Sequence, residues 1–202
     1  MFSEQLKTTL CRFYAVLGIS IELMHRLDYL IIIIKYQLKE KYEMLIREYT
    51  QNDIPDMIRI WNEVVEEGIA FPQEECLNIE TGTSFFASQS YTGVAEEEGV
   101  IFGLYILHPN NVDRCGHICN ASYAVSSEIR GRHIGEKLVV DCLKKGRELG
   151  FRVLQFNAVV ESNTHARHLY ERLGFTQLGT IPGGFRMKDG HYENICPYYH
   201  EL

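Results

Sequence analysis

The sequence lacks the cysteine spacing of a disulfide framework or a structural zinc site. Six cysteines are spread over 202 residues, and no two of them form a C-x-x-C pair. Cys115 and Cys119 flank a histidine, but this stretch is apolar and strand-like, and no second ligand pair lies at zinc spacing. The chain also has no clear secretory signal. We therefore expect reduced thiols, no metal site and a cytoplasmic location.

The chain has little positive charge. Lysine and arginine number 20 against 27 aspartates and glutamates, which gives a formal net charge of -7. Non-specific nucleic-acid binding needs a positive face that displaces counterions, so no nucleic-acid partner is expected. Hydrophobic residues make up 46% and charged residues 23%, as in ordinary globular proteins. The length suits one compact domain with a short appendage.

No uninterrupted apolar run long enough for a membrane span occurs near the N-terminus. Residues 13–21 and 29–34 are uncharged, but Glu22, Arg26 and Asp28 lie between them. A spanning helix needs about 20 mostly apolar residues, and each central charge costs about 2.5–3.5 kcal/mol. Residues 1–44 are better explained as a helical extension that docks on the body, a partner or a membrane surface. Apolar residues recur at helical spacing on two faces of this extension. The first face consists of Leu6, Leu10, Phe13, Tyr14 and Leu17, and the second of Leu23, Leu27, Leu30, Ile31, Ile34 and Leu38.

Residues 45–202 predict one α/β domain with no internal repeat or boundary. Strands are expected at 45–49, 91–96, 100–107, 117–125, 151–160, 177–181 and 191–199, and helices at 53–68, 134–150 and 166–173. Asp53 is the expected N-cap of the first helix. An acidic turn at residues 97–99 predicts a hairpin. Residues 71–84 show no strong periodicity and predict a loop or short helix beside a substrate pocket.

The segment at residues 126–135 joins a strand end to a helix start. The first N–H groups of a helix lack intrahelical partners, and the helix dipole is positive there. Gly131 and Gly135 allow close backbone approach, while Arg130 and Arg132 add charge. This pattern predicts a phosphate or pyrophosphate site. It is neither a Walker loop nor G-x-G-x-x-G, and by itself it is equally explained by a basic turn that caps a helix.

A second segment, residues 163–175, reads N-T-H-A-R-H-L-Y-E-R-L-G-F. Together the two segments resemble the GNAT acetyltransferase superfamily, whose motifs read [RQ]-x-x-G-x-[GA] and N-x-x-A-x-x-[LF]-Y-x-x-x-G-F. The second motif matches at every marked position. The first departs once, because His133 stands where glycine is usual, which affects close approach at one amide. The resemblance covers residues 45–202 and implies a twisted, mostly antiparallel mixed sheet flanked by helices.

The resemblance implies acetyl-CoA as co-substrate. Its pyrophosphate would bind the amides of Arg130, Gly131, Arg132, His133, Ile134 and Gly135. Its pantetheine arm would pair with the strand end at Tyr123 and Val125, as an added strand does, and would bond Asn163. Tyr170 would protonate the departing thiolate, since a phenol can serve as an acid there. A core aromatic on a helix face is the alternative for Tyr170.

A finer resemblance rests on Pro109-Asn110 and on residues 117–121, 155–159 and 181–183. These segments resemble a GNAT branch that includes fungal enzymes acetylating proline analogues such as azetidine-2-carboxylate. The branch implies that Asn120 holds the substrate carboxylate and that Asn157 stabilises the oxyanion. Both lie in apolar strands, where a buried amide needs partners; bonding to backbone across the sheet edge is the alternative. The fungal branch has tryptophan where Tyr170 stands, so the thiolate step is expected to differ in detail from that branch. Substrate identity is not carried over.

The sequence therefore predicts an N-acetyltransferase for a small-molecule amine or amino-acid analogue. Direct attack is expected, because the cysteines show no accompanying base motif. The alternatives are a protein or peptide N-acetyltransferase and a CoA-binding sensor without turnover. The general base stays open among Glu96–Glu98, His108, His117, His191 and a water chain. A homodimer is an expectation from the family only.

Overall fold

The computed structural model describes Arg26, residues 29–31 and residues 44–202 except residue 130. Contacts divide the chain into residues 1–43 and 44–202. Arg26 and residues 29–31 are helical, and the other residues of the predicted extension helices lie outside the described residues. Within the described part of the chain, no helix has the length and apolar character to cross a membrane. The fold below is that of residues 44–202.

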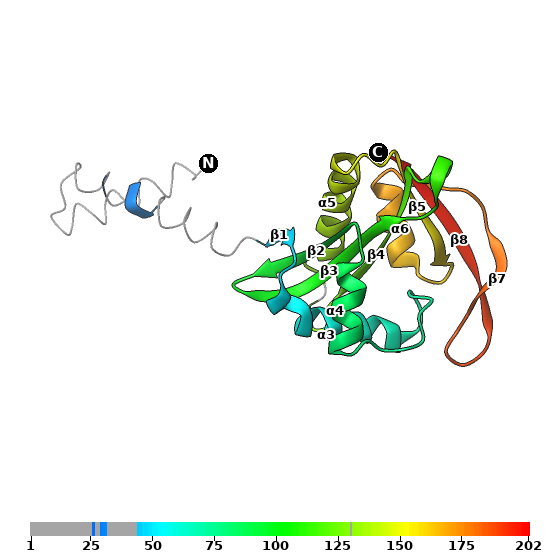
Figure 1. Cartoon of the computed structure of the whole chain (residues 1–202), viewed down its shortest axis with the longest axis horizontal. Helices are drawn as coiled ribbons and strands as arrows, with labels where there is room; N and C mark the ends of the chain where they lie inside the picture. Colours follow the sequence, from blue (N-terminus) through cyan, green and yellow to red (C-terminus); the bar gives the residue numbers. More distant parts are fainter. Residues whose placement is uncertain (1–25, 27–28, 32–43, 130) are drawn as a thin grey trace, which may run out of the picture. The chain divides into compact units, whose positions relative to one another are not determined.

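One sheet of eight strands runs through residues 44–202 (Figure 1). The strands are β1 (Leu45–Glu48), β2 (Tyr91–Glu97), β3 (Val100–Pro109), β4 (Ile118–Val125), β5 (Val153–Val160), β6 (Thr176–Gln177), β7 (Ile181–Arg186) and β8 (Tyr192–Glu201). Their order is β1-β2-β3-β4-β5-β8-β6, with β7 also paired to β8. Only β4 and β5 pair in parallel among these described strands. The predicted mixed, mostly antiparallel sheet is confirmed.

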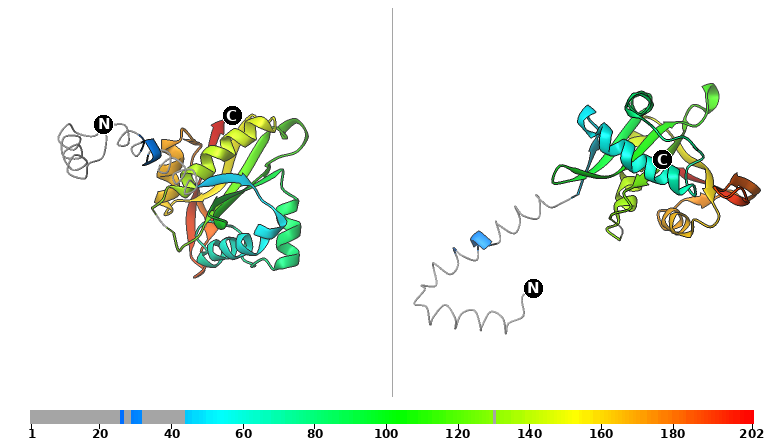
Figure 2. Two further views of the ribbon diagram at one scale, coloured as in Figure 1. Left: turned by 90° about the vertical axis from the view of Figure 1, so that its left-hand side faces the viewer. Right: turned by 90° about the horizontal axis from the view of Figure 1, so that it is seen from below.

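Helices cover both faces of the sheet (Figure 2). The pair α3 (Ile54–Glu67) and α4 (Ile79–Ala87) packs on one face, and α5 (Ile134–Glu148) and α6 (Thr164–Arg172) pack on the other. Apolar side chains of strand β3 point alternately to the two faces of the sheet, so both faces need a covering layer. Leu104 and Ile106 belong to the core under α3, whereas Tyr105 and Leu107 belong to the core under α5.

Strands β4 and β5 separate soon after they begin. Only Ile118–Val153 and Cys119–Leu154 are paired, although each strand has eight residues. Strand β5 is further bent by an irregularity between Phe156 and Val159 in its pairing with β8. The carboxyl halves of β4 and β5 therefore present backbone groups to each other across an unpaired interval.

The sequence prediction differs from the structure in two segments. Residues 79–87 form the nine-residue helix α4, which is one of the two alternatives expected for residues 71–84 but runs three residues beyond that segment. The strand predicted at 177–181 is wrong in extent, because Gly179 at φ 157° separates the two-residue β6 from β7, which runs on to Arg186. Pro182 lies in β7, a strand paired only with β8 among the described strands, and this suits a residue without an N–H.

Asp53 is the N-cap residue of α3 by position, but its carboxylate does not cap that helix. It accepts the Thr50 N–H at 2.6 Å and two guanidinium N–H groups of Arg47 at 2.7 and 3.0 Å. Arg47 also donates to Glu96 at 2.6 Å. The hydrogen bond from Arg47 lowers the pKa of the Asp53 carboxyl below its ordinary value. These contacts tie β1 and β2 to the start of α3.

We predict that Asp53→Asn lowers the free energy of unfolding at pH 7 by about 1–3 kcal/mol, because a charge-assisted bond is lost in a buried setting. Because the pKa of this carboxyl is lower in the folded than in the unfolded chain, its ionised form stabilises the fold above the unfolded-state pKa, near 4. This stabilisation is lost as pH falls through the folded-state pKa. The difference between wild type and Asp53→Asn in urea denaturation should therefore shrink below about pH 4.

The matched control is Asp56→Asn. Asp56 also lies at the start of α3, but its side chain is half-exposed and makes a long contact of 3.6 Å with the Arg59 guanidinium. This control should change stability by less than about 1 kcal/mol. A difference for Asp53→Asn that does not depend on pH would contradict the assignment.

Candidate active site

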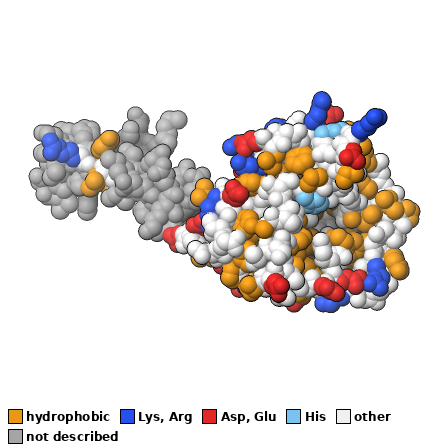
Figure 3. Space-filling view, viewed as in Figure 1, with side chains coloured by type: hydrophobic (Ala, Val, Ile, Leu, Met, Phe, Trp, Pro, Cys, Tyr) orange, Lys and Arg blue, Asp and Glu red, His pale blue; other side chains and the backbone are white. Residues whose placement is uncertain are grey.

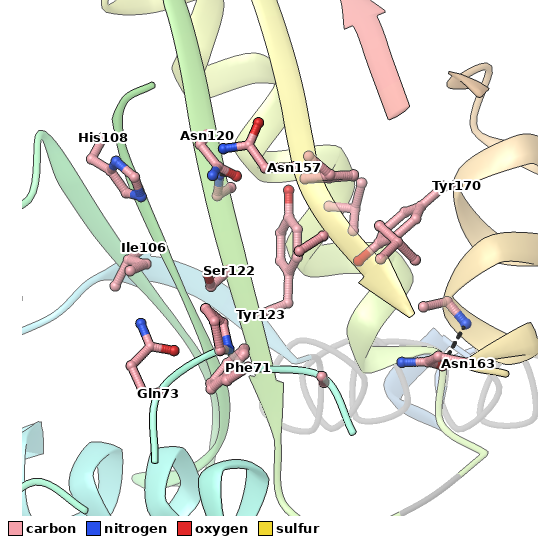
Figure 4. Close-up of a pocket in the computed structure, with 18 of the residues that line it drawn as sticks. Phe71, Gln73, Ile106, His108, Asn120, Ser122, Tyr123, Asn157, Asn163 and Tyr170 are labelled. Atoms are coloured by element: carbon pink, nitrogen blue, oxygen red, sulfur yellow. Dashed lines mark hydrogen bonds between the residues drawn. The ribbon is translucent and has the colours of Figure 1, made fainter. Parts of the chain in front are cut away.

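A cavity of about 700 Å³ opens where β4 and β5 separate (Figure 4). Its walls come from β3, β4, β5, the first turns of α5, helix α6 with its cap residue, and the segments at residues 70–73 and 85–89. Six residues singled out from the sequence line it, namely Asn120, Tyr123, Gly135, Asn157, Asn163 and Tyr170. Side chains from positions more than 40 residues apart therefore meet in one place.

The start of α5 faces one end of this cavity. The first helical bond runs from the Lys137 N–H to the His133 carbonyl at 3.1 Å, so the amides of Ile134, Gly135 and Glu136 precede it. Gly135 lines the cavity, and a Cβ placed there would have Leu169 as its nearest contact, at 3.8 Å. The positive end of the helix dipole thus lies at open space, as an anion site requires.

His133 precedes α5 in the left-handed conformation, with φ 56°. A residue with a Cβ adopts this conformation at an energetic cost that glycine avoids. The glycine preference of the motif at this position therefore has a backbone cause, and the imidazole instead turns toward Glu136, 3.1 Å away. Gly131, at φ 79°, supplies the second left-handed residue of the loop.

Several residues predicted to bind the cofactor point elsewhere. Arg132 donates to Glu97 at 2.6 Å and lies over Phe102, so its charge is shared with the β2–β3 hairpin. The predicted contact of the cofactor with the Arg132 amide does not involve this side chain and stays a prediction. The Ile134 side chain is buried in the core, which leaves only its amide for a ligand. Val125 does not line the cavity, and Arg130 lies outside the described residues.

Asn163 and Tyr170 come from α6. The Asn163 carboxamide oxygen accepts the Ala166 N–H at 3.2 Å and caps the helix (Figure 4), while its NH₂ group has no acceptor among the described residues. The ring of Tyr170 packs against Phe156 at 4.4 Å between centroids. Its hydroxyl bonds no described residue, and burial raises its pKa. Tyr170 is thus both a packed aromatic and a protonated phenol in the cavity wall.

The two strand asparagines differ in environment. Asn120 is half-buried; its oxygen accepts the Ala121 N–H at 2.7 Å, and its NH₂ group has no acceptor among the described residues. Asn157 is exposed, which corrects the expectation of a buried amide, because β5 has left its partner β4 at this point. Asn157 donates to Asn110 at 2.7 Å and accepts from Gln155 at 2.9 Å. These side-chain partners replace the backbone bonds considered from the sequence.

The sequence model of the Acetyltransferase (GNAT) family matches residues 53–175, more than half of the chain. The chain belongs to this family. The family resemblance inferred from the two motifs is confirmed, whereas the finer branch stays a prediction.

Related proteins agree with the family and the fold. The chain is 32% identical to N-acetyltransferase aca1 of Schizosaccharomyces pombe over 126 residues, which cover 62% of this chain and 59% of that relative. A GCN5-related N-acetyltransferase from Kribbella flavida superposes with a TM-score of 0.73 at 30% identity, over 79% of this chain and 98% of that one. The structure of yncA from Salmonella typhimurium with its cofactor acetyl-CoA superposes with a TM-score of 0.74 at 20% identity. The superposition covers 79% of this chain and 94% of that one. The predicted GNAT fold is thereby confirmed.

The described residues that line the cavity carry no permanent charge. Among its described lining residues none is Asp, Glu, Lys or Arg, and the groups that titrate are His108, Tyr123 and Tyr170. The face of residues 44–202 seen in Figure 3 likewise carries most of its charges near the outline. Burial raises the pKa of Tyr123, as it does for Tyr170. Both phenols therefore stay protonated at neutral pH.

The candidates for the general base differ in whether they line the cavity. His108 lines the cavity, whereas Glu96–Glu98, His117 and His191 do not. Phe71, Pro72 and Gln73 also line it, in agreement with the pocket role predicted for residues 71–84. The contribution of Phe85, Ser88 and Gln89 was not predicted from the sequence, because the expected pocket segment ended at residue 84, whereas α4 runs to Ala87.

No metal centre is found in the described part of the chain, where no three His, Cys, Asp or Glu side chains gather. Cys119 is buried and donates its thiol hydrogen to the Val153 carbonyl, at an Sγ–O distance of 3.3 Å. Cys115, its neighbour in sequence, is exposed.

Proposed function

We propose that this chain is an acetyl-CoA-dependent N-acetyltransferase that acetylates the amine of a small molecule or amino-acid analogue by direct attack. One observation carries the proposal: a single cavity joins the start of α5 to Tyr170 and Asn120. The positive helix end fits the pyrophosphate of the donor, and the opposite end fits a small polar acceptor. Family membership supports the reaction class.

In this proposal acetyl-CoA lies in the cavity with its pyrophosphate at the start of α5 and its thioester near Tyr170. Its pyrophosphate binds the amides from Gly131 to Gly135, where the helix dipole favours an anion. Its pantetheine arm takes the place of a missing strand beside the separated half of β4, near Tyr123. The NH₂ group of Asn163 donates to the arm, because the Asn163 oxygen is already used as the helix cap. This direction brings the thioester to Tyr170.

Transfer then needs three events at the thioester. The amine nitrogen attacks the carbonyl carbon, negative charge develops on the oxygen, and the thiolate leaves. Asn157 can stabilise the oxyanion with the N–H that Asn110 does not use. Tyr170, kept protonated by burial, supplies a proton to the thiolate. No cysteine is among the described residues that line the cavity, which favours direct transfer.

The acceptor end favours a neutral or zwitterionic molecule. A polycationic amine would lose water contacts in this cavity without meeting a described carboxylate. The NH₂ group of Asn120 instead offers a donor to a carboxylate, and a volume of about 700 Å³ suits a small ligand. An extended acidic groove would have favoured a peptide acceptor, and a sensor would have no use for a protonated phenol beside the thioester.

Gly135→Glu should abolish micromolar binding of acetyl-CoA, measured by calorimetry, because an anionic side chain at the helix start repels and displaces the pyrophosphate. Gly135→Ala is the matched control, because a Cβ at this position meets only Leu169 at 3.8 Å. The control should retain affinity within about tenfold, or 1.4 kcal/mol. Equal binding by both variants would place the pyrophosphate elsewhere.

Asn120→Asp should raise the KM for an amino-acid acceptor by at least about tenfold, because two carboxylates would face each other. The same variant should change the KM much less for the matching amino-acid amide, which lacks the acceptor carboxylate. Free thiol release reports the rates, and an unchanged KM for acetyl-CoA controls for damage to the donor site. Equal effects on acid and amide, or a wild-type preference for peptides, would contradict the proposed acceptor class.

A further inference from the structure

His108 stands opposite Asn120 in the sheet. It is the next-to-last residue of β3, and the two residues are direct partners in the antiparallel pairing of β3 with β4. Partners of this kind carry their side chains on the same face of a sheet. Both line the cavity, and Figure 4 shows them at the same end of it. The imidazole therefore lies beside the group that we propose binds the acceptor.

The hydrogen bonding of His108 fixes which ring nitrogen is available. Its Nδ1 lies 2.9 Å from the Pro109 carbonyl oxygen, which can only accept. Nδ1 therefore carries the hydrogen of the neutral ring, and Nε2 carries the lone pair. No described side chain bonds Nε2. A neutral imidazole in this tautomer is prepared to accept a proton.

The surroundings leave His108 as the one suitable base among the described lining residues. The other titratable groups of the described lining are Tyr123 from β4 and Tyr170 from α6. Both pack against the core on the α5 side of the sheet, and both phenols stay protonated. The neighbouring wall segments contribute Gln73, Ser88 and Gln89, which carry no charge. No ammonium or carboxylate of the described lining competes with the imidazole for the proton of the acceptor.

We propose that Nε2 of His108 is the general base that deprotonates the acceptor amine; this rests on the proposed function. The ammonium gives one proton to Nε2, which passes it to solvent. The freed amine forms its bond to the acetyl carbon and gives its second proton to Nε2. The carbon–sulfur bond breaks, the electron pair leaves with sulfur, and the thiolate takes the phenolic proton of Tyr170. The phenolate regains the proton held by His108, so one proton is released per turnover.

His108→Gln should lower kcat/KM for the acceptor by about 10²–10⁴ at pH 7, with acetyl-CoA affinity unchanged. The deficit relative to wild type should shrink as rising pH frees the amine, so the pH–rate profile of the variant should differ from that of wild type. His117→Gln is the matched control, because His117 is exposed and does not line the cavity. It should leave kcat/KM and its pH profile unchanged.

A second variant, His108→Ala, separates a base from a structural role. Imidazole added to the medium should restore part of its rate, since a small base can enter the space left by the side chain. Activity of His108→Gln within about threefold of wild type, with the same pH profile, would overturn the base assignment and leave the proposed function standing. Lack of rescue in a folded His108→Ala that binds acetyl-CoA would also overturn it. A wild type that binds acetyl-CoA but acetylates no amine would refute the proposed function itself.

Discussion

The separation of β4 from β5 after two residue pairs is the constraint on which the site depends. These strands run in parallel, so their carboxyl ends lie at the same edge of the sheet, and the chain enters α5 after β4 and α6 after β5. Both helix starts are thereby brought to the interval between the strands. The start of α5, the phenol of α6 and the half of β4 that is not paired with β5 meet in one cavity because of this separation.

The two ends of that cavity differ in electrostatic character. One end has the unpaired amides at the start of α5, which favour a phosphate without any lysine or arginine in the described lining. The other end has carboxamides and one imidazole, which favour a small neutral or zwitterionic acceptor. Between them, burial keeps the phenols of Tyr123 and Tyr170 protonated. The assignment of donor and acceptor ends follows from this difference rather than from the shape of the cavity.

Local patterns predicted the local parts of this structure. Helical periodicity located α5 and α6, the acidic turn marked the β2–β3 hairpin, and the two motifs indicated the family. Features that depend on pairing between distant segments were missed. The exposure of Asn157 follows from the loss of a partner strand, the Arg132–Glu97 pair links residues 35 apart, and His108 could be separated from His117 and His191 only by its register against Asn120. Weak periodicity around Gly82 likewise left a loop and a short helix as alternatives for the segment that forms α4.

Backbone hydrogen exchange with and without acetyl-CoA tests the central claim most directly, because it reports the amides themselves. Ligand binding should slow exchange at residues 131–136 and at the separated end of β4, residues 123–125, since both would donate to or pair with the bound donor. Amides of α3, on the other face of the sheet, should be little affected. Protection confined to segments outside the cavity, or no protection at saturating acetyl-CoA, would contradict the account.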